Sequence, residues 1–221
     1  MMQGGTGTAY TRCIPSAPAA LPGFEHVNRY WDNGNQRHAA KILPGEYYVT
    51  RQDELVATVL GSCISACVRD RVLGIGGMNH FMLPMGTDPN ERCASTSLSA
   101  ANRYGNFAME HLINTILKHG GSRRNLEVKV FGGGRMIAGM TDIGRRNIEF
   151  IRDYLSTEGF QVAAEDLGDI YPRKVLYHPL SGRARIKRLR SLHNDTIVQR
   201  EVRYLEEIER HPMEGEVELF E

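Results

Sequence analysis

Residues 55–83 read LVATVLGSCISACVRDRVLGIGGMNHFML, and this stretch decides the fold. It is rich in β-branched and small residues, with a polar interruption at residues 69–73, which is typical of two strands joined by a turn. Leu55 opens the first apolar run of this stretch, and Pro84 ends the pattern directly after it. The strands we expect are residues 55–60, 62–68 and 74–83. The stretch therefore predicts an antiparallel hairpin preceded by a third strand.

The register of this hairpin places a thiol beside an imidazole. A turn centred between Arg71 and Val72 sets Cys63 directly opposite His80. Opposed residues of an antiparallel pair point to the same face, with Cβ atoms about 4.5–5.5 Å apart. A register slip of one residue would move the two side chains to opposite faces. The sequence thus predicts a Cys63–His80 pair, conditional on the register.

Such a pair suits nucleophilic catalysis. A free thiol has a pKa of about 8.5, and a neighbouring imidazolium favours the reactive thiolate. Gly61 and Ser62 are small, so a substrate carbonyl could approach the backbone there and meet N–H groups that stabilise an oxyanion. The alternative is that Cys63 is a buried apolar residue, since free cysteines commonly pack in cores. Cys67 shares a strand face with Cys63 and is expected in the core.

Other candidate sites are weaker. Residues 132–134 are three glycines but lack the Lys-Ser/Thr ending of a phosphate-binding loop, so we interpret them as a turn that allows close backbone packing. His111 and His119 have no evident acidic partner, and zinc needs three or four converging ligands. Cys13 and Cys93 have no clear partner either, so we expect reduced thiols, no disulfide framework and no metal site.

Further elements surround the hairpin and complete a mixed α+β domain. Apolar spacing predicts helices at 102–119 and around 148–155, each ended by glycine. The remaining strands we expect are residues 46–50, 126–131, 160–164, 174–177 and 184–189. This predicts a layered α/β sandwich with a mixed, mostly antiparallel sheet and two main helices. We expect a mobile N-terminal arm at 1–41, a catalytic domain at 42–190, and a C-terminal polar helix with an acidic tail at 191–221. Residues 85–99 have loop composition and are expected at the rim of the site.

Bulk properties exclude several classes of protein. The 221 residues carry 27 Lys and Arg against 26 Asp and Glu, so no basic face for nucleic acid is expected. No apolar run approaches the roughly 18 residues that suggest a membrane-spanning helix. Residues 1–5 show neither a charged leader nor an apolar core, which predicts a cytoplasmic protein without a secretory signal.

Several segments together resemble the CheD family, the chemoreceptor glutamine deamidases. The resemblance covers most of the chain between residues 42 and 189. The matching segments are residues 58–63 (TVLGSC), 76–84 (GGMNHFMLP), 129–134 (KVFGGG), 143–147 (IGRRN), 164–168 (AEDLG) and 173–175 (RKV).

The resemblance implies a Cys-His-Thr arrangement, with Cys63 as nucleophile, His80 as general base and Thr58 as third member. It implies that glutamine side chains on helices of methyl-accepting chemotaxis receptors are converted to glutamate, without cofactor, in a shallow surface cleft. It also implies a CheC-type phosphatase as a partner. Two rival interpretations remain: a cysteine peptidase or transglutaminase-like enzyme using the same pair, and a non-catalytic adaptor that binds receptors or the phosphatase.

Overall fold

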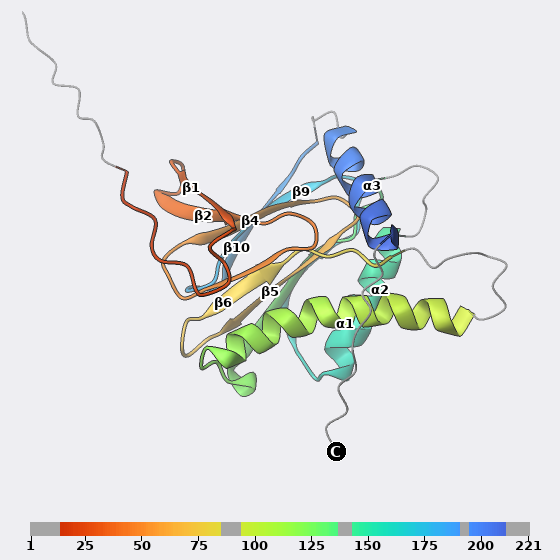
Figure 1. Ribbon diagram of the computed structural model, residues 1–221, viewed down its shortest axis with the longest axis horizontal. Helices are drawn as coiled ribbons and strands as arrows, with labels where there is room; N and C mark the ends of the chain where they lie inside the picture. Colours follow the sequence, from red (N-terminus) through yellow and green to blue (C-terminus); the bar gives the residue numbers. More distant parts are fainter. Residues whose placement is uncertain (1–13, 85–93, 137–142, 191–194, 211–221) are drawn as a thin grey trace, which may run out of the picture.

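The computed structural model describes residues 14–84, 94–136, 143–190 and 195–210 (Figure 1). The strands there are β1 (Asn28–Asp32), β2 (Arg37–Lys41), β3 (Tyr47–Thr50), β4 (Leu55–Leu60), β5 (Ile64–Asp70), β6 (Gly76–Asn79), β7 (Leu126–Gly132), β8 (Val162–Leu167), β9 (Arg173–His178) and β10 (Arg183–Arg188). The helices are α1 (Ala94–Lys118), α2 (Ile143–Thr157) and α3 (Asp195–Arg210), with a 3₁₀ turn at Arg123–Asn125.

These strands form two five-stranded sheets. One has the order β1-β2-β4-β9-β10 and the other β3-β6-β5-β7-β8. Pairing is antiparallel except between β2 and β4 and between β7 and β8. The predicted α+β class, layered sandwich and mixed, mostly antiparallel pairing are confirmed. The strands are divided between two sheets, and α3 is a third helix in addition to the two predicted main helices.

The two main helices predicted from the sequence cover the second sheet. α1 packs on β3, β5 and β6, and α2 packs on β5 and on α1. Figure 1 shows α1 running across this face with α2 beside it. α1 buries an apolar stripe at helical spacing, Met109, Leu112, Ile113 and Ile116. This stripe joins one continuous core that includes Cys67, as expected from the sequence.

The β5–β6 hairpin differs in register from the prediction. Cys67 lies opposite Met78, and Ile64 bridges Phe81, which shifts the pairing by two residues. The turn is as long as expected but is centred one residue later, between Val72 and Leu73, whose backbone N–H groups both donate hydrogen bonds to Asp70. A shift of two residues preserves the face of every side chain. Cys63 and His80 therefore stay on the same face, as diagonal neighbours just beyond the paired strands.

Residues 28–41, which the sequence analysis assigns to the N-terminal arm, contain two strands. β1 and β2 form a hairpin, and β2 pairs in parallel with β4, with Ala40 opposite Val56. Ala39 and Ala40 are fully buried, so this hairpin belongs to the first sheet. The sequence did not predict β2 because polar residues flank its short apolar pair, Ala39 and Ala40. Likewise the helix α1 begins at Ala94, inside the segment 85–99 that we expected to be a loop; residues 85–93 lie outside the described part.

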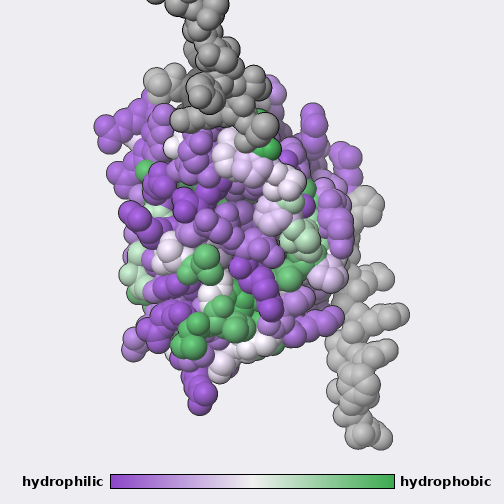
Figure 2. All heavy atoms as spheres, turned by 90° about the vertical axis from the view of Figure 1, so that its left-hand side faces the viewer, coloured by the Kyte–Doolittle hydropathy of each residue, from purple (hydrophilic) through white to green (hydrophobic). Residues whose placement is uncertain are grey.

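The far end of β5 is apolar at the surface. The turns that follow β5 and β9 expose Val72, Leu73 and Leu180. Figure 2 shows hydrophobic residues gathered on this side of the molecule. The first turn carries Gly74, where an added Cβ would lie 2.8 Å from a methyl group of Leu180, so the two turns are in contact. None of the helices among the described residues combines the length and apolar character needed to cross a membrane.

Candidate active site

The segment Gly61-Ser62-Cys63 connects the two sheets, leading from β4 to β5. Its carbonyl groups are held from one side. The N–H of Gly134 donates to Gly61 O at 2.7 Å, and the N–H of Gly133 donates to Cys63 O at 2.9 Å. From α2, the Asn147 amide donates to Ser62 O at 2.9 Å. With the three carbonyls fixed in this way, the N–H groups of the segment are free to face the opposite side.

The glycines at 132–134 act as the sequence predicts, by close packing. Gly132 has a φ of +119°, and an added Cβ would collide with the carbonyl oxygen of Cys63. A side chain at this position is excluded both by the backbone conformation and by the lack of space. The glycine run therefore sets the shape of the Cys63 segment.

A carboxylate from α3 sits on the free N–H groups. One oxygen of Glu201 accepts from the N–H of Gly61 at 2.8 Å and from that of Cys63 at 3.4 Å. The other oxygen accepts from the N–H of Ser62 at 2.9 Å and from its hydroxyl at 2.7 Å. The segment is thus an anion-binding nest of converging donors, and Glu201 fills it.

His80 is oriented by a hydroxyl group. Its Nδ1 lies 2.7 Å from Thr58 Oγ1, and Oγ1 lies 2.9 Å from the carbonyl oxygen of Ile42. A hydroxyl has one proton, and the carbonyl can only accept, so Thr58 donates to Ile42. Nδ1 must then carry the imidazole proton and donate it to Thr58. This leaves Nε2 unprotonated with its lone pair free, and the atom is buried without a hydrogen-bond partner among the described residues.

Three potential ligand atoms converge here. A carboxylate oxygen of Glu201, Sγ of Cys63 and a ring nitrogen of His80 all lie within 4.8 Å of one another. Zinc favours these ligand types, so the cluster is the candidate for a metal among the described residues. Hydrogen bonds already engage both carboxylate oxygens, however, and they account for the position of Glu201.

Comparison with known proteins places the chain in a family. The family described as "CheD chemotactic sensory transduction" matches residues 82–188. A protein of Halorhodospira halophila, named probable chemoreceptor glutamine deamidase CheD, is 60% identical over 206 residues, which cover 93% of this chain and 95% of the relative. The chain belongs to the CheD family. CheD relatives with the same name are 56% identical in Hahella chejuensis, covering 92% of this chain and 95% of the relative, and 48% identical in Saccharophagus degradans, covering both chains fully.

In this CheD chain the thiol and imidazole are both shielded from solvent. Cys63 is 0% exposed and His80 1% exposed. Burial, reinforced by the Glu201 carboxylate, raises the pKa of the Cys63 thiol well above its ordinary value. Burial, with the positive charge of Arg200, lowers the pKa of His80 to about 3. The resting pair is therefore a neutral thiol beside a neutral imidazole.

All five residues singled out from the sequence meet at this one place. Gly61, Ser62 and Cys63 form the nest, and Thr58 orients His80. The CheD resemblance suggested an open, shallow cleft, whereas α3 covers the site. Sequence reasoning did not identify Glu201 or Asn147. The one available signal for Glu201 was its place in an apolar stripe of α3, where a charged residue is unusual.

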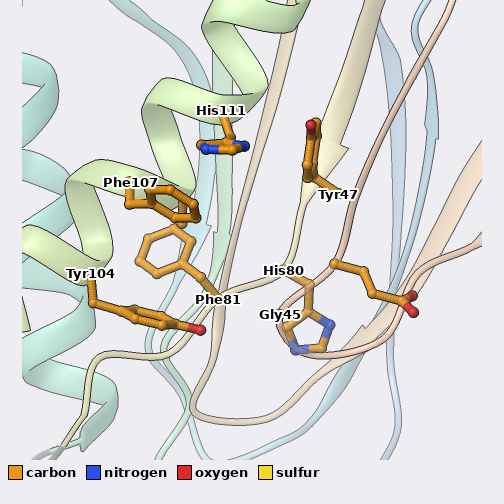
Figure 3. A pocket seen from close by; sticks show the side chains of 9 residues that line it. Gly45, Tyr47, His80, Phe81, Tyr104, Phe107 and His111 are labelled. Carbon is orange, nitrogen blue, oxygen red and sulfur yellow. The ribbon is translucent and has the colours of Figure 1, made fainter. Parts of the chain in front are cut away.

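A pocket of about 140 Å³ adjoins the site on the α1 side (Figure 3). Figure 3 shows Tyr104, Phe107 and His111 of α1 along one wall and Tyr47 facing them, with His80 at the base. The hydroxyl of Tyr104 is also hydrogen-bonded to that of Tyr204 in α3. In this CheD chain Tyr104 therefore lines the pocket and also contacts α3.

Proposed function

We propose that this chain is a protein-glutamine deamidase that converts glutamine side chains of chemotaxis receptors to glutamate and releases ammonia. The names of its relatives support the reaction and its target. The observation that carries the chemistry is the pairing of a thiol and an unprotonated imidazole nitrogen beside a nest of N–H groups. Acyl transfer to a thiol needs these three parts: a nucleophile, a base and an oxyanion site.

The first half of the reaction forms a thioester. With a substrate in place of Glu201, Nε2 of His80 takes the proton of Cys63, and the thiolate attacks the side-chain amide carbon. The carbonyl oxygen becomes an oxyanion that accepts hydrogen bonds from the N–H groups of the nest. The C–N bond then breaks as the imidazolium gives its proton to the leaving nitrogen. Ammonia departs and Cys63 carries the acyl group.

The second half regenerates the enzyme. His80 takes a proton from water, and the hydroxide attacks the thioester carbon. The C–S bond breaks, the thiolate leaves, and a glutamate side chain remains. Thr58 supports both halves because its acceptor position keeps the proton on Nδ1 and the lone pair on Nε2. Asn147 and the glycine run serve as positioning residues for the nest.

Peptide mass spectrometry tests the proposal. A receptor cytoplasmic fragment is incubated with the protein and, separately, with Cys63→Ala. We expect a gain of about one dalton at defined glutamines with the native protein alone, without chain cleavage or cross-linking. Cleavage or cross-links would indicate the peptidase or transglutaminase interpretation. An unmodified receptor that nevertheless binds both proteins would indicate the adaptor interpretation.

The place of action and the partners follow from the same proposal. The receptor helices that carry methylation sites are cytoplasmic, so the chain would act in the cytoplasm. A CheC-type phosphatase is a second partner implied by the family. Binding of purified phosphatase and receptor fragment to Cys63→Ala, which would trap partners without turnover, tests both.

A further inference from the structure

The helix α3 binds the rest of the protein through one face. Glu201, Tyr204, Leu205 and Ile208 are its buried residues. Their spacing of three, four and seven positions is that of an amphipathic helix lying in a groove. Glu201 stands at the start of this stripe, and its side chain enters the nest beside Cys63. α3 thus presents a carboxylate to the thiol in the manner of a docked helical ligand.

A charged residue in this position needs an explanation. Glu201 is 0% exposed, and no cation among the described residues forms an ion pair with it. Burying a carboxylate is costly, and an apolar side chain of similar size often stabilises a fold better. Packing alone therefore does not account for Glu201. Its partners do, because they are the donors that the proposed reaction uses for the oxyanion.

We propose that α3 occupies the groove for the substrate helix and that Glu201 mimics the glutamate of a deamidated product. This inference rests on the proposed function. Both a product and Glu201 offer a carboxylate on a two-carbon stem from a helix. In the described state α3 therefore closes the enzyme, and a receptor helix must displace it.

The contacts of α3 also specify the substrate. A helix that replaces it would place its glutamine where Glu201 lies. Bulky apolar or aromatic residues three, four and seven positions later would then occupy the places of Tyr204, Leu205 and Ile208. Glutamines followed by this pattern are the expected targets. Glutamines followed by charges at these positions should be poor substrates.

Glu201→Gln converts the mimic into a substrate and provides the test. The full-length variant would attack its own introduced glutamine: the thioester forms between Cys63 and that side chain, ammonia leaves, and water restores glutamate. We expect a gain of about one dalton at position 201, first-order and independent of protein concentration, because the reaction is intramolecular. The double variant Glu201→Gln, Cys63→Ala should keep its introduced glutamine.

Two controls lie on the same helix. Gln199 is exposed and must remain unchanged in every variant. Glu206→Gln makes the same substitution on the solvent side of α3, and the glutamine introduced there must also persist. If the glutamine at position 201 persists in a variant that deamidates a receptor fragment, α3 is not a product mimic and the inference is overturned. If it persists and the native protein also fails on the receptor, the deamidase proposal itself fails.

Closure by α3 has a separate readout in Cys63 reactivity. Leu205→Ala weakens the packing of α3 against the rest of the protein and leaves the residues of the nest unchanged. We expect alkylation of Cys63 by iodoacetamide, measured on the isolated peptide, to become at least about ten-fold faster, as loss of a buried leucine contact predicts. Receptor deamidation should also accelerate at low receptor concentration. Equal alkylation rates in the variant and the native protein would show that α3 does not control access.

Discussion

At the scale of single residues, Thr58 fixes the proton of His80. Thr58→Val removes the acceptor of the Nδ1 proton while keeping the side-chain volume. The imidazole can then adopt the other tautomer, and we expect the deamidation kcat to fall about 10- to 100-fold. Thr58→Ser retains the hydroxyl and should keep most of the activity. Steady-state kinetics on a receptor fragment measure both. Equal loss in the two variants would argue against an orienting hydroxyl.

Gly61 makes room for the carbonyl of the substrate. An added Cβ would lie 2.7 Å from one oxygen of Glu201 and 2.8 Å from Met136 Cγ. Gly61→Ala should therefore expel both the carboxylate and a substrate amide from the nest. We expect kcat/KM to fall about 10²- to 10³-fold, as for loss of an oxyanion contact. Circular dichroism should show an unchanged fold. Retained activity in a folded variant would place the oxyanion elsewhere.

His80 makes stability depend on pH. Its pKa is lowered from 6.5 to about 3 in the folded protein, where Thr58, Cys63, Glu201 and Arg200 surround it. Between these values the unfolded chain binds a proton that the folded chain does not, so stability falls as pH decreases. The slope from this residue is at most about 1.4 kcal/mol per pH unit. Urea unfolding of His80→Asn should show a shallower pH slope, and an unchanged slope would contradict this.

At the scale of elements, α2 holds the Cys63 segment through one side chain. Asn147 donates to Ser62 O and accepts from the N–H of Leu83 at 2.9 Å, and it is fully buried. Asn147→Leu leaves both backbone groups without their partner. We expect the free energy of unfolding to decrease by about 2–5 kcal/mol, measured by urea titration. A loss below about 1 kcal/mol would mean that water replaces the amide.

Helices and strands with strong periodicity could be predicted from the sequence, whereas the pairing between them could be predicted only in part. β4 was predicted to the residue, and α2 lies around its predicted apolar positions. The Cys63–His80 pair was expected from a register that was wrong by two residues. The error was harmless because side chains alternate with a period of two. The hydrogen bonds from the N–H groups of Val72 and Leu73 to Asp70 support a turn centred one residue later than predicted.

Contacts between residues that are far apart in the sequence could not be predicted. Glu201 lies 140 positions from Gly61, and only the folded chain brings them together. The sheet partner of β2 is likewise set by packing of Ala39 and Ala40, which look unremarkable in the sequence. The boundaries at residues 41 and 190 were drawn from composition, which does not register such contacts. The limits of the catalytic domain stay a prediction.

At the scale of the whole molecule, stability should be unevenly distributed. α3 covers the site with one face, whereas β5 pairs on both sides and is buried almost throughout. We expect amide hydrogens of α3 to exchange through local opening at a lower free energy than those of β5 and β7. Native-state exchange read by mass spectrometry gives this order. Equal protection of the helix and the central strands would show that α3 opens only on global unfolding.

The first sheet supplies Thr58, the second leads to His80, and Cys63 stands on the link between them. Neither half of the sandwich contains a working constellation by itself. Deamidation of the receptor would consequently be lost as soon as the two sheets move apart, even while spectroscopy still detects the β-structure of each sheet. Enzyme assays during gentle heating would thus report on the packing of the two sheets against each other. They would detect displacements that leave the secondary structure intact.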